Sequence, residues 1–189
     1  MKNVTLVTAS VLLGLSMANS ASAFVFNGSE YSIVDGTSYS NPPGPGNTTR
    51  ADFTWTEAKT DAESNGGHLA TFGDSAEWNA VVAGLGLNGD PNYWLGGSQD
   101  FTRSNDNSAN WSWVDGTAWN FTAWAGGEPN DHGCCRNSEN YLMTWGDGSV
   151  WNDEGNGSRT FTNQGYVLEK VANVPEPSSL LLLGLGLAG

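Results

Sequence analysis

The chain has 189 residues, of which 20 are acidic and 7 are basic, and its formal net charge at pH 7 is -13. This length suits one domain of ordinary size and excludes two large ones. The acidic balance argues against nucleic acid as a partner, because binding to phosphates requires a basic patch. Aromatic residues make up 11% of the chain, so the sequence can form a packed core and is not disordered throughout.

Residues 1–23 predict a secretory signal peptide. Lys2 supplies the positive start, residues 4–15 are mostly apolar, and residues 21–23 (Ala-Ser-Ala) form a small-residue cleavage site. We therefore expect an exported protein whose folded domain spans residues 24–173.

Two helices are predicted in the first half of this domain. Residues 54–64 place Trp55, Ala58 and Ala62 on one helical face, and Thr54 with Glu57 three residues later predicts a capping box. A second, shorter helix is predicted to start at Ser75.

Strands are predicted on both sides of the helices, and two stretches are predicted to be loops. Strand-like segments lie at residues 30–34, 68–72, 93–97, 111–115, 141–143, 150–151 and 166–168. The Pro-Gly-rich residues 36–50 predict a loop. Residues 116–140 contain no clear helix or strand but hold three large aromatic residues, so we expect a long, ordered and functional loop there. These elements predict an α+β domain.

Oxygen-bearing side chains are concentrated in three short segments, at residues 128–131, 139–140 and 151–154. Calcium takes six to eight oxygen ligands from Asp, Glu and Asn, whereas soft metals prefer Cys or His. The residues alone therefore favour a calcium site, and a solvated acidic loop remains the alternative because sequence spacing does not show that the segments converge.

The chain resembles the C-type lectin-like domain family over about 140 residues. The matching motifs follow the family's order at residues 55–58, 68–72, 94–97, 113–116, 119–121, 124, 128–130 (Glu-Pro-Asn) and 151–153 (Trp-Asn-Asp), with residues 166–169 as the last strand. The resemblance implies two helices packed on two small antiparallel sheets, with a long ligand-binding loop.

The resemblance also implies the ligands of a calcium ion. These are Glu128, Asn130, Glu139, Asn152 and Asp153, and Pro129 is expected to follow a cis peptide bond, which is accessible mainly before proline. The same five residues, together with His132, are expected to contact a carbohydrate. The Glu-Pro-Asn form is typical of relatives that prefer mannose, glucose, GlcNAc or fucose over galactose.

A second ion site is implied less directly. Asp131 follows the tripeptide as it does in relatives with an auxiliary calcium site, and Asp100 is a possible further ligand. The alternative is that Asp131 is simply solvated.

The cysteine pattern departs from that of the family. Cys134 and Cys135 are adjacent, so we expect two thiols or a local clip rather than a disulfide framework. The family's usual disulfides have no partners here, since Tyr141, Asn156 and Leu168 lie near the expected cysteine positions.

Residues 174–189 resemble a second known sequence type, the PEP-CTERM sorting signal of Gram-negative bacteria that produce exopolysaccharide. Residues 175–177 are Pro-Glu-Pro and an apolar stretch begins at Leu180, whereas the basic tail of such signals is missing. Ten apolar residues are too few for a membrane span, which needs about 20. The resemblance implies an exosortase as processing partner, a transient membrane contact, and a final location at the cell surface or in the extracellular matrix.

Together these observations predict a non-enzymatic, calcium-dependent lectin that is exported. Multimers or a multivalent glycan would compensate for weak binding at a single site. A glycosidase would need an acid pair such as Glu128 with Glu139 or Asp153, but the interleaved Asn130 and Asn152 fit metal coordination better. The alternative function is a C-type lectin-like module that binds a protein or matrix partner, with calcium only bracing the loop. The sequence does not identify the glycan.

Overall fold

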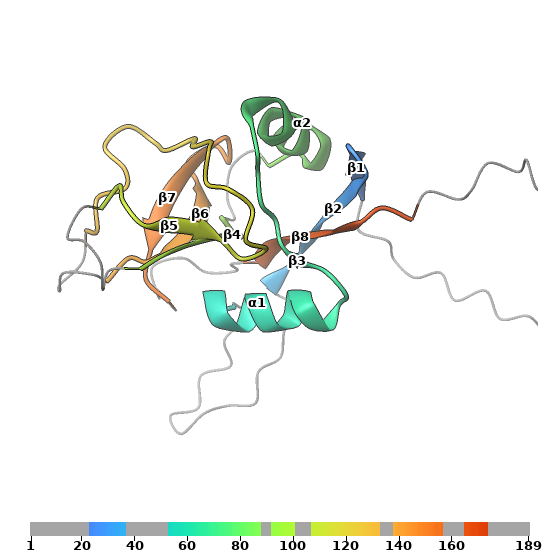
Figure 1. Ribbon diagram of the computed structural model, residues 1–189, viewed down its shortest axis with the longest axis horizontal. Coiled ribbons are helices and arrows are strands. Elements are labelled where there is room, and N and C mark those ends of the chain that lie inside the picture. The colour runs from blue at the N-terminus through green and yellow to red at the C-terminus, as the bar shows by residue number, and fades with distance from the viewer. Residues whose placement is uncertain are drawn as a thin grey trace, which may run out of the picture.

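The computed structural model of the protein describes residues 23–36, 53–87, 92–100, 107–132, 138–156 and 165–173 (Figure 1). Outside these ranges lie most of the predicted signal peptide, most of the 36–50 loop, Cys134, Cys135 and the 174–189 segment. Neither helix in the described part of the chain has the length and apolar character of a membrane span.

Two helices and eight strands make up the described fold. The helices are α1 (Trp55–Ser64) and α2 (Ser75–Leu85). The strands are β1 (Phe24–Phe26), β2 (Ser29–Val34), β3 (His68–Leu69), β4 (Tyr93–Gln99), β5 (Trp111–Trp113), β6 (Tyr141–Trp145), β7 (Val150–Glu154) and β8 (Gly165–Val171).

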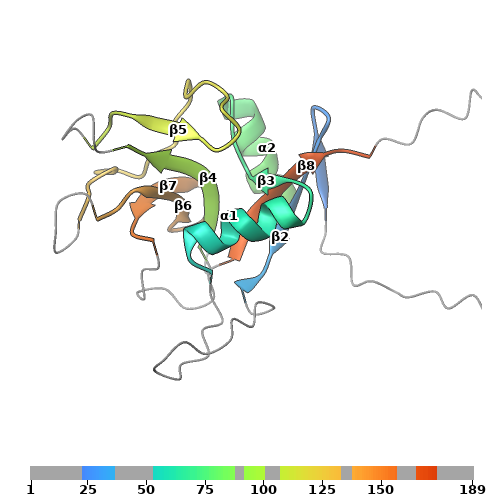
Figure 2. The same ribbon diagram turned by 60° about the horizontal axis from the view of Figure 1, so that its bottom comes forward.

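The strands form one mixed sheet in the order β1-β2-β8-β4-β6-β7, with β3 paired to β8 and β5 paired to β4. The pairs between named strands are antiparallel except the short parallel contact of β4 with β8. This contact joins the two small antiparallel sheets of the prediction into one hydrogen-bonded network. The predicted α+β arrangement is confirmed, with α1 and α2 packed on the sheet (Figure 2).

The start of α1 follows the sequence prediction in detail. Thr54 Oγ1 accepts from the Glu57 N–H at 3.2 Å, and Glu57 Oε2 accepts from the Thr54 N–H at 2.8 Å, which completes the predicted capping box. Trp55, Ala58 and Ala62 are buried as expected. α2 starts at Ser75 as predicted, but with 11 residues against 10 in α1 it is not the shorter helix. Its N-cap is Asp74, whose carboxylate accepts from two N–H groups of the first helical turn.

Positions near the expected family cysteines make other contacts. The ring of Tyr141 packs on that of Trp55 with centroids 4.6 Å apart. Asn156 accepts from the Thr56 N–H at 3.3 Å and donates to Thr56 Oγ1 at 3.2 Å. Both contacts connect the start of α1 to the second half of the domain, without a disulfide.

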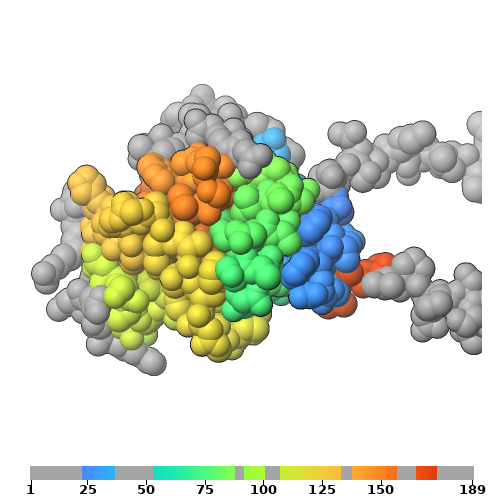
Figure 3. Space-filling model, turned by 90° about the horizontal axis from the view of Figure 1, so that it is seen from above, coloured from blue at the N-terminus to red at the C-terminus, as the bar shows by residue number. Residues whose placement is uncertain are grey.

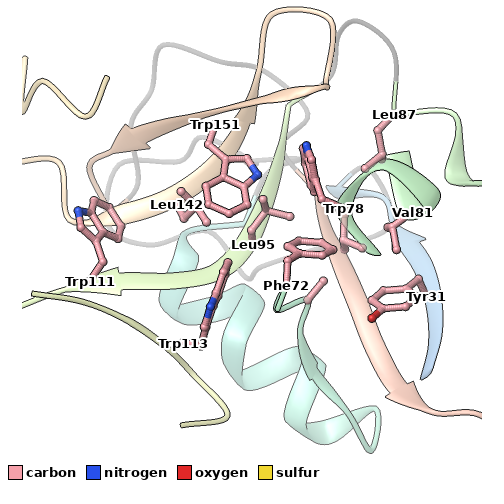
Figure 4. Packing of buried hydrophobic residues seen from close by; sticks show 12 residues of the cluster. Tyr31, Phe72, Trp78, Val81, Leu87, Leu95, Trp111, Trp113, Leu142 and Trp151 are labelled. Atoms are coloured by element: carbon pink, nitrogen blue, oxygen red, sulfur yellow. The ribbon is translucent and has the colours of Figure 1, made fainter. Parts of the chain in front are cut away.

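The centre of the larger core cluster is Trp151, which is fully buried (Figure 4). Its ring lies 5.5 Å from that of Trp78 and 5.7 Å from that of Trp113, centroid to centroid. Phe121 and Trp124, from the predicted long loop, lie at 5.3 and 5.8 Å. The loop is therefore packed onto the core, as its aromatic residues predicted.

The fold separates two ends of the molecule. β1 starts and β8 ends on one side, whereas β5, β6, β7 and the loop after β5 lie on the other (Figures 1 and 2). The space-filling view shows this loop, in yellow, lying directly beside α2, in green (Figure 3).

We predict that Trp151→Ala destabilises the protein by about 3–5 kcal/mol, because it removes the ring around which the aromatic cluster packs. Urea unfolding followed by circular dichroism measures the change. Val171→Ala is the control, since that side chain is 89% exposed and its truncation is expected to cost less than about 0.5 kcal/mol. Equal unfolding midpoints for the two variants would contradict this view of the core.

Candidate functional site

The first half of the long loop is attached to β7, the last strand in the sheet order. The Ala125 N–H donates to the Trp151 carbonyl and the Trp151 N–H donates to the Ala123 carbonyl, both at 2.8 Å. Trp124 and Trp151 form an isolated parallel bridge. The backbone of residues 123–125 thus extends the sheet and fixes where the following Glu-Pro-Asn segment begins.

The next attachment is made by the carboxylate of Asp153, which is fully buried. Its Oδ1 accepts from the Asn130 N–H at 3.0 Å and its Oδ2 accepts from the Asp131 N–H at 2.8 Å. The Glu128–Pro129 peptide is cis, as the family resemblance implied. The Glu-Pro-Asn segment and the Trp-Asn-Asp strand are therefore directly connected.

The last residues of the loop lie against residues 131 and 132 in its second half. Asp131 Oδ1 accepts from the N–H groups of Ser138 at 2.8 Å and Glu139 at 3.1 Å. The His132 N–H donates to both Asn130 Oδ1 and Glu139 Oε2, and its nitrogen lies 2.6 Å from each oxygen. Because one N–H reaches both oxygens, the Asn130 amide and the Glu139 carboxylate lie side by side, although nine positions separate them in sequence.

A hollow of about 270 Å³ opens where these segments meet. The residues that line it are Glu128, Asn130, His132, Glu139, Trp145, Asn152 and Glu154. Four of the five predicted calcium ligands are therefore brought together, along with His132. Asp153, the fifth, does not line the hollow; it lies beside Glu128 and holds the loop.

The residues predicted for a second ion are placed differently. Neither Asp131 nor Asp100 lines the hollow. Asp131 binds the backbone of residues 138 and 139, as described above. Asp100 follows β4, where its N–H donates to the Asn110 carbonyl at 3.1 Å. A second ion site remains a hypothesis, and the structure gives Asp131 a role within the loop.

Two residues of the hollow were not among the predicted site residues, although Glu154 belongs to the oxygen-rich segment 151–154 of the sequence. Glu154 follows Asn152 by two positions on β7, and side chains two apart on a strand share a face. That alternation is the signal that could have identified Glu154. Trp145 ends β6, and we find no sequence signal that marks it as part of a site.

The acidic groups of the hollow perturb one another. Burial raises the pKa of Glu128 to about 7, and its hydrogen bond to and repulsion by Asp153 add to this. Burial also raises the pKa of Glu139 to about 7, followed by repulsion from Glu154 and Asp153. Glu128 Oε2 is buried and has no hydrogen-bond partner within the described residues. Close carboxylates of this kind favour a bound cation.

The donor set matches calcium only when the amides are included. In the described ranges, no three His, Cys, Asp or Glu side chains form a metal-binding group by themselves. The hollow adds the amides of Asn130 and Asn152 to the carboxylates of Glu128 and Glu139, and oxygen donors of this kind suit calcium rather than a soft metal. The residues present therefore fit the ion that the family implies.

Residues 52–161 match the Lectin C-type domain family. The chain belongs to this family. Residues 173–189 match the PEP-CTERM protein-sorting motif, which agrees with the prediction from the Pro-Glu-Pro segment. Members of the family are generally non-enzymatic binding modules.

Curated relatives match this chain over only part of their length. The type-2 ice-structuring protein of Hemitripterus americanus is 31% identical over 103 residues, which are 53% of this chain and 55% of that protein. This lectin-family chain thus spans about half the length of the curated relatives it matches.

Solved structures confirm the fold. The cow CD23 C-type carbohydrate-recognition domain, determined in the presence of a GlcNAc2Man3 oligosaccharide, has a TM-score of 0.58 at 21% identity, with 81% of this chain and 95% of that chain covered. A calcium-independent type II antifreeze protein has a TM-score of 0.56 at 20% identity, with 81% and 94% covered.

We predict that the calcium-free protein becomes less stable as the pH rises from about 4.5 to about 7. A carboxyl whose folded pKa is raised stabilises the fold most below its ordinary value of 4.5, and this contribution is lost as pH rises through the folded value. The loss is expected to be about 1 kcal/mol for each carboxyl, since partial exposure screens the repulsion.

Urea unfolding in metal-free buffer at pH 5 and pH 8 checks this expectation. Glu128→Gln and Glu139→Gln should each flatten the pH dependence, whereas Glu30→Gln, at the other end of the sheet, should leave it unchanged. A wild-type stability that rises over this interval would contradict the raised pKa values.

Proposed function

We propose that the protein is a calcium-dependent carbohydrate-binding protein. The observation that carries the proposal is the hollow in which the Glu-Pro-Asn loop meets the Trp-Asn-Asp strand. There two carboxylates, Glu128 and Glu139, lie with two amides, Asn130 and Asn152. Membership of the C-type lectin family supports it.

The four predicted ligands that line the hollow would hold the calcium ion; these are Glu128, Asn130, Glu139 and Asn152. When bound, calcium supplies coordination positions that two neighbouring sugar hydroxyls can fill. The Asp153 carboxylate already receives the N–H groups of Asn130 and Asp131, so its main task is to keep the loop in place for that ligand set.

The side chains of the hollow can recognise hydroxyl groups directly. A sugar hydroxyl is both a donor and an acceptor. The carboxylates of Glu128 and Glu139 can accept a hydrogen bond from its O–H group, and the amides of Asn130 and Asn152 can donate one to its oxygen. The order of acceptors and donors around the hollow then selects the arrangement of hydroxyls that fits.

The expected preference is for mannose, glucose or fucose, as the Glu-Pro-Asn form implies by resemblance to the family. The hollow is small and its binding groups are few, so we expect a single-site dissociation constant near millimolar, or about -4 kcal/mol. Retention on a glycan then requires several sites acting together, from clustered copies or a repeating polymer.

The second candidate function is recognition of something other than sugar. The similarity to an ice-structuring protein and to a calcium-independent antifreeze protein favours it, because both share the fold. In that case the acidic hollow would serve only to brace the loop, with or without calcium.

The sorting motif supports a location outside the cell. We propose that the protein is exported by a Gram-negative bacterium, processed by an exosortase-type enzyme at its C-terminal segment, and retained at the surface or in the matrix. The glycan would then be an exopolysaccharide or a foreign surface polymer.

Calorimetric titration with calcium, then with methyl mannoside in calcium and in chelator, tests the proposed function. We expect calcium binding, and mannoside binding that is lost in chelator because the ligand set is then incomplete. Calcium binding without any sugar response would favour the second candidate function. Absence of calcium binding would exclude calcium-dependent sugar recognition.

The sugar preference is tested by the double substitution Glu128→Gln and Asn130→Asp. Exchanging the carboxylate and the amide reverses the order of acceptor and donor at this part of the hollow, so we expect preference to shift from mannose toward galactose by about tenfold, or about 1.4 kcal/mol. A glycan array read with wild type and variant side by side measures the shift. Unchanged mannose binding by the variant would place sugar recognition elsewhere.

A further inference from the structure

Gly155 follows the last residue of β7 and lies against the end of the long loop. Tyr141 and Glu154 form the β6–β7 pair farthest from the turn between these strands, so the residues that lead into β6 pass close to Gly155. A Cβ atom added to Gly155 would lie 2.9 Å from the Ser138 carbonyl oxygen. Non-bonded heavy atoms ordinarily stay about 3.5 Å apart or more, so only glycine leaves room for this carbonyl where it is.

The need for glycine at this position is one of space and not of backbone conformation. Gly155 is not among the glycines with a positive φ angle. Alanine can therefore adopt the same backbone angles, and an added methyl group would act only through its contact. The atom that it would meet belongs to the backbone, which cannot swing aside as the tip of a flexible side chain can.

The Ser138 carbonyl and the Glu139 N–H belong to one peptide unit, which is planar and rigid. The Glu139 N–H donates to Asp131 Oδ1 at 3.1 Å, and the Ser138 N–H donates to the same oxygen at 2.8 Å. The peptide unit is therefore held between the Asp131 carboxylate and Gly155. Displacing its carbonyl would also displace the Cα atom of Glu139, because that atom lies in the same plane.

The group whose position depends on this peptide unit is the Glu139 carboxylate. It lines the hollow, and its Oε2 accepts from the His132 N–H. Calcium takes oxygen ligands at about 2.3–2.6 Å, and the groups of a working site must be held within about 0.5 Å. Relieving the contact of a Cβ atom at position 155 requires a displacement of about this size.

We propose that Gly155 is a positioning residue of the calcium site: its missing side chain lets the Ser138–Glu139 peptide unit lie where the Glu139 carboxylate can reach the ion. This inference rests on the calcium binding of the proposed function. Gly155 acts through Glu139 and has no side chain that could touch the ion.

The test variant is Gly155→Ala, and its matched control is Gly126→Ala. Gly126 belongs to the same loop and precedes Glu128 by two residues; it also lacks a positive φ angle, and a Cβ atom there would meet nothing within 4 Å. Calorimetric titration with calcium chloride should show affinity weakened by about 10- to 100-fold in Gly155→Ala. Gly126→Ala should stay within about twofold of wild type.

A double-mutant cycle separates positioning of Glu139 from a general effect on the loop. In a Glu139→Gln background, adding Gly155→Ala should change the calcium affinity by less than about twofold, because the carboxylate that Gly155 positions is already gone. An equally large loss in both backgrounds would show that Gly155 does not act through Glu139, and would overturn the inference.

Hydrogen exchange in the calcium-free protein provides a readout that needs no ion. In Gly155→Ala, the Ser138 and Glu139 amides should exchange several-fold faster than in wild type, because their hydrogen bonds to Asp131 are disturbed. The amides of β8 should keep their wild-type rates, which also reports that the variant is folded. Unchanged exchange at residues 138 and 139, or loss of protection in β8, would overturn the inference; the second result would mean that Gly155 serves the whole fold.

The outcomes separate this inference from the proposed function. If wild type does not bind calcium, the proposed function fails and this inference fails with it. If wild type binds calcium and Gly155→Ala binds it equally well, only this inference is overturned. If wild type binds calcium but no sugar, the proposed function fails, and the calcium affinities of the variants still decide the role of Gly155.

Discussion

The carboxylate of Asp153 accepts from the backbone N–H groups of Asn130 and Asp131 while being shielded from solvent. A buried carboxylate is costly unless it is hydrogen-bonded, and both of its oxygens are used here. The contact connects the end of β7 to the middle of the long loop. The position of Glu128, the turn at Asp131 and the return to Glu139 all follow from it.

A chain of such contacts holds the described parts of the long loop in place without regular secondary structure. Residues 123–125 pair with the edge of β7, Asp153 holds residues 130 and 131, and Asp131 holds residues 138 and 139. Beneath them, Trp151 packs against rings from both the sheet and the loop. The hydrophobic core and the polar site therefore depend on three consecutive residues of one strand, Trp151 to Asp153.

Much of this was predictable because local patterns decided it. The capping box at Thr54, the buried face of α1 and the cis bond before Pro129 depend on neighbouring residues or on a motif, and the structure has all three. The short strand β1 was not predicted, because it depends on pairing with β2. The parallel β4–β8 contact and the inclusion of Trp145 in the hollow also depend on residues far apart in sequence, which hydrophobic periodicity does not report.

The division of the molecule into two ends has a geometrical consequence. The C-terminal end of strand β8 points away from the rest of the domain, on the side opposite β7 and the loop after β5 (Figure 1). If the protein were tethered through the residues that follow β8, the hollow would face away from the tethering surface. Copies tethered in this way on one surface would carry their hollows in a common outer layer. A repeating polymer could then lie across many of them without any of the domains touching one another.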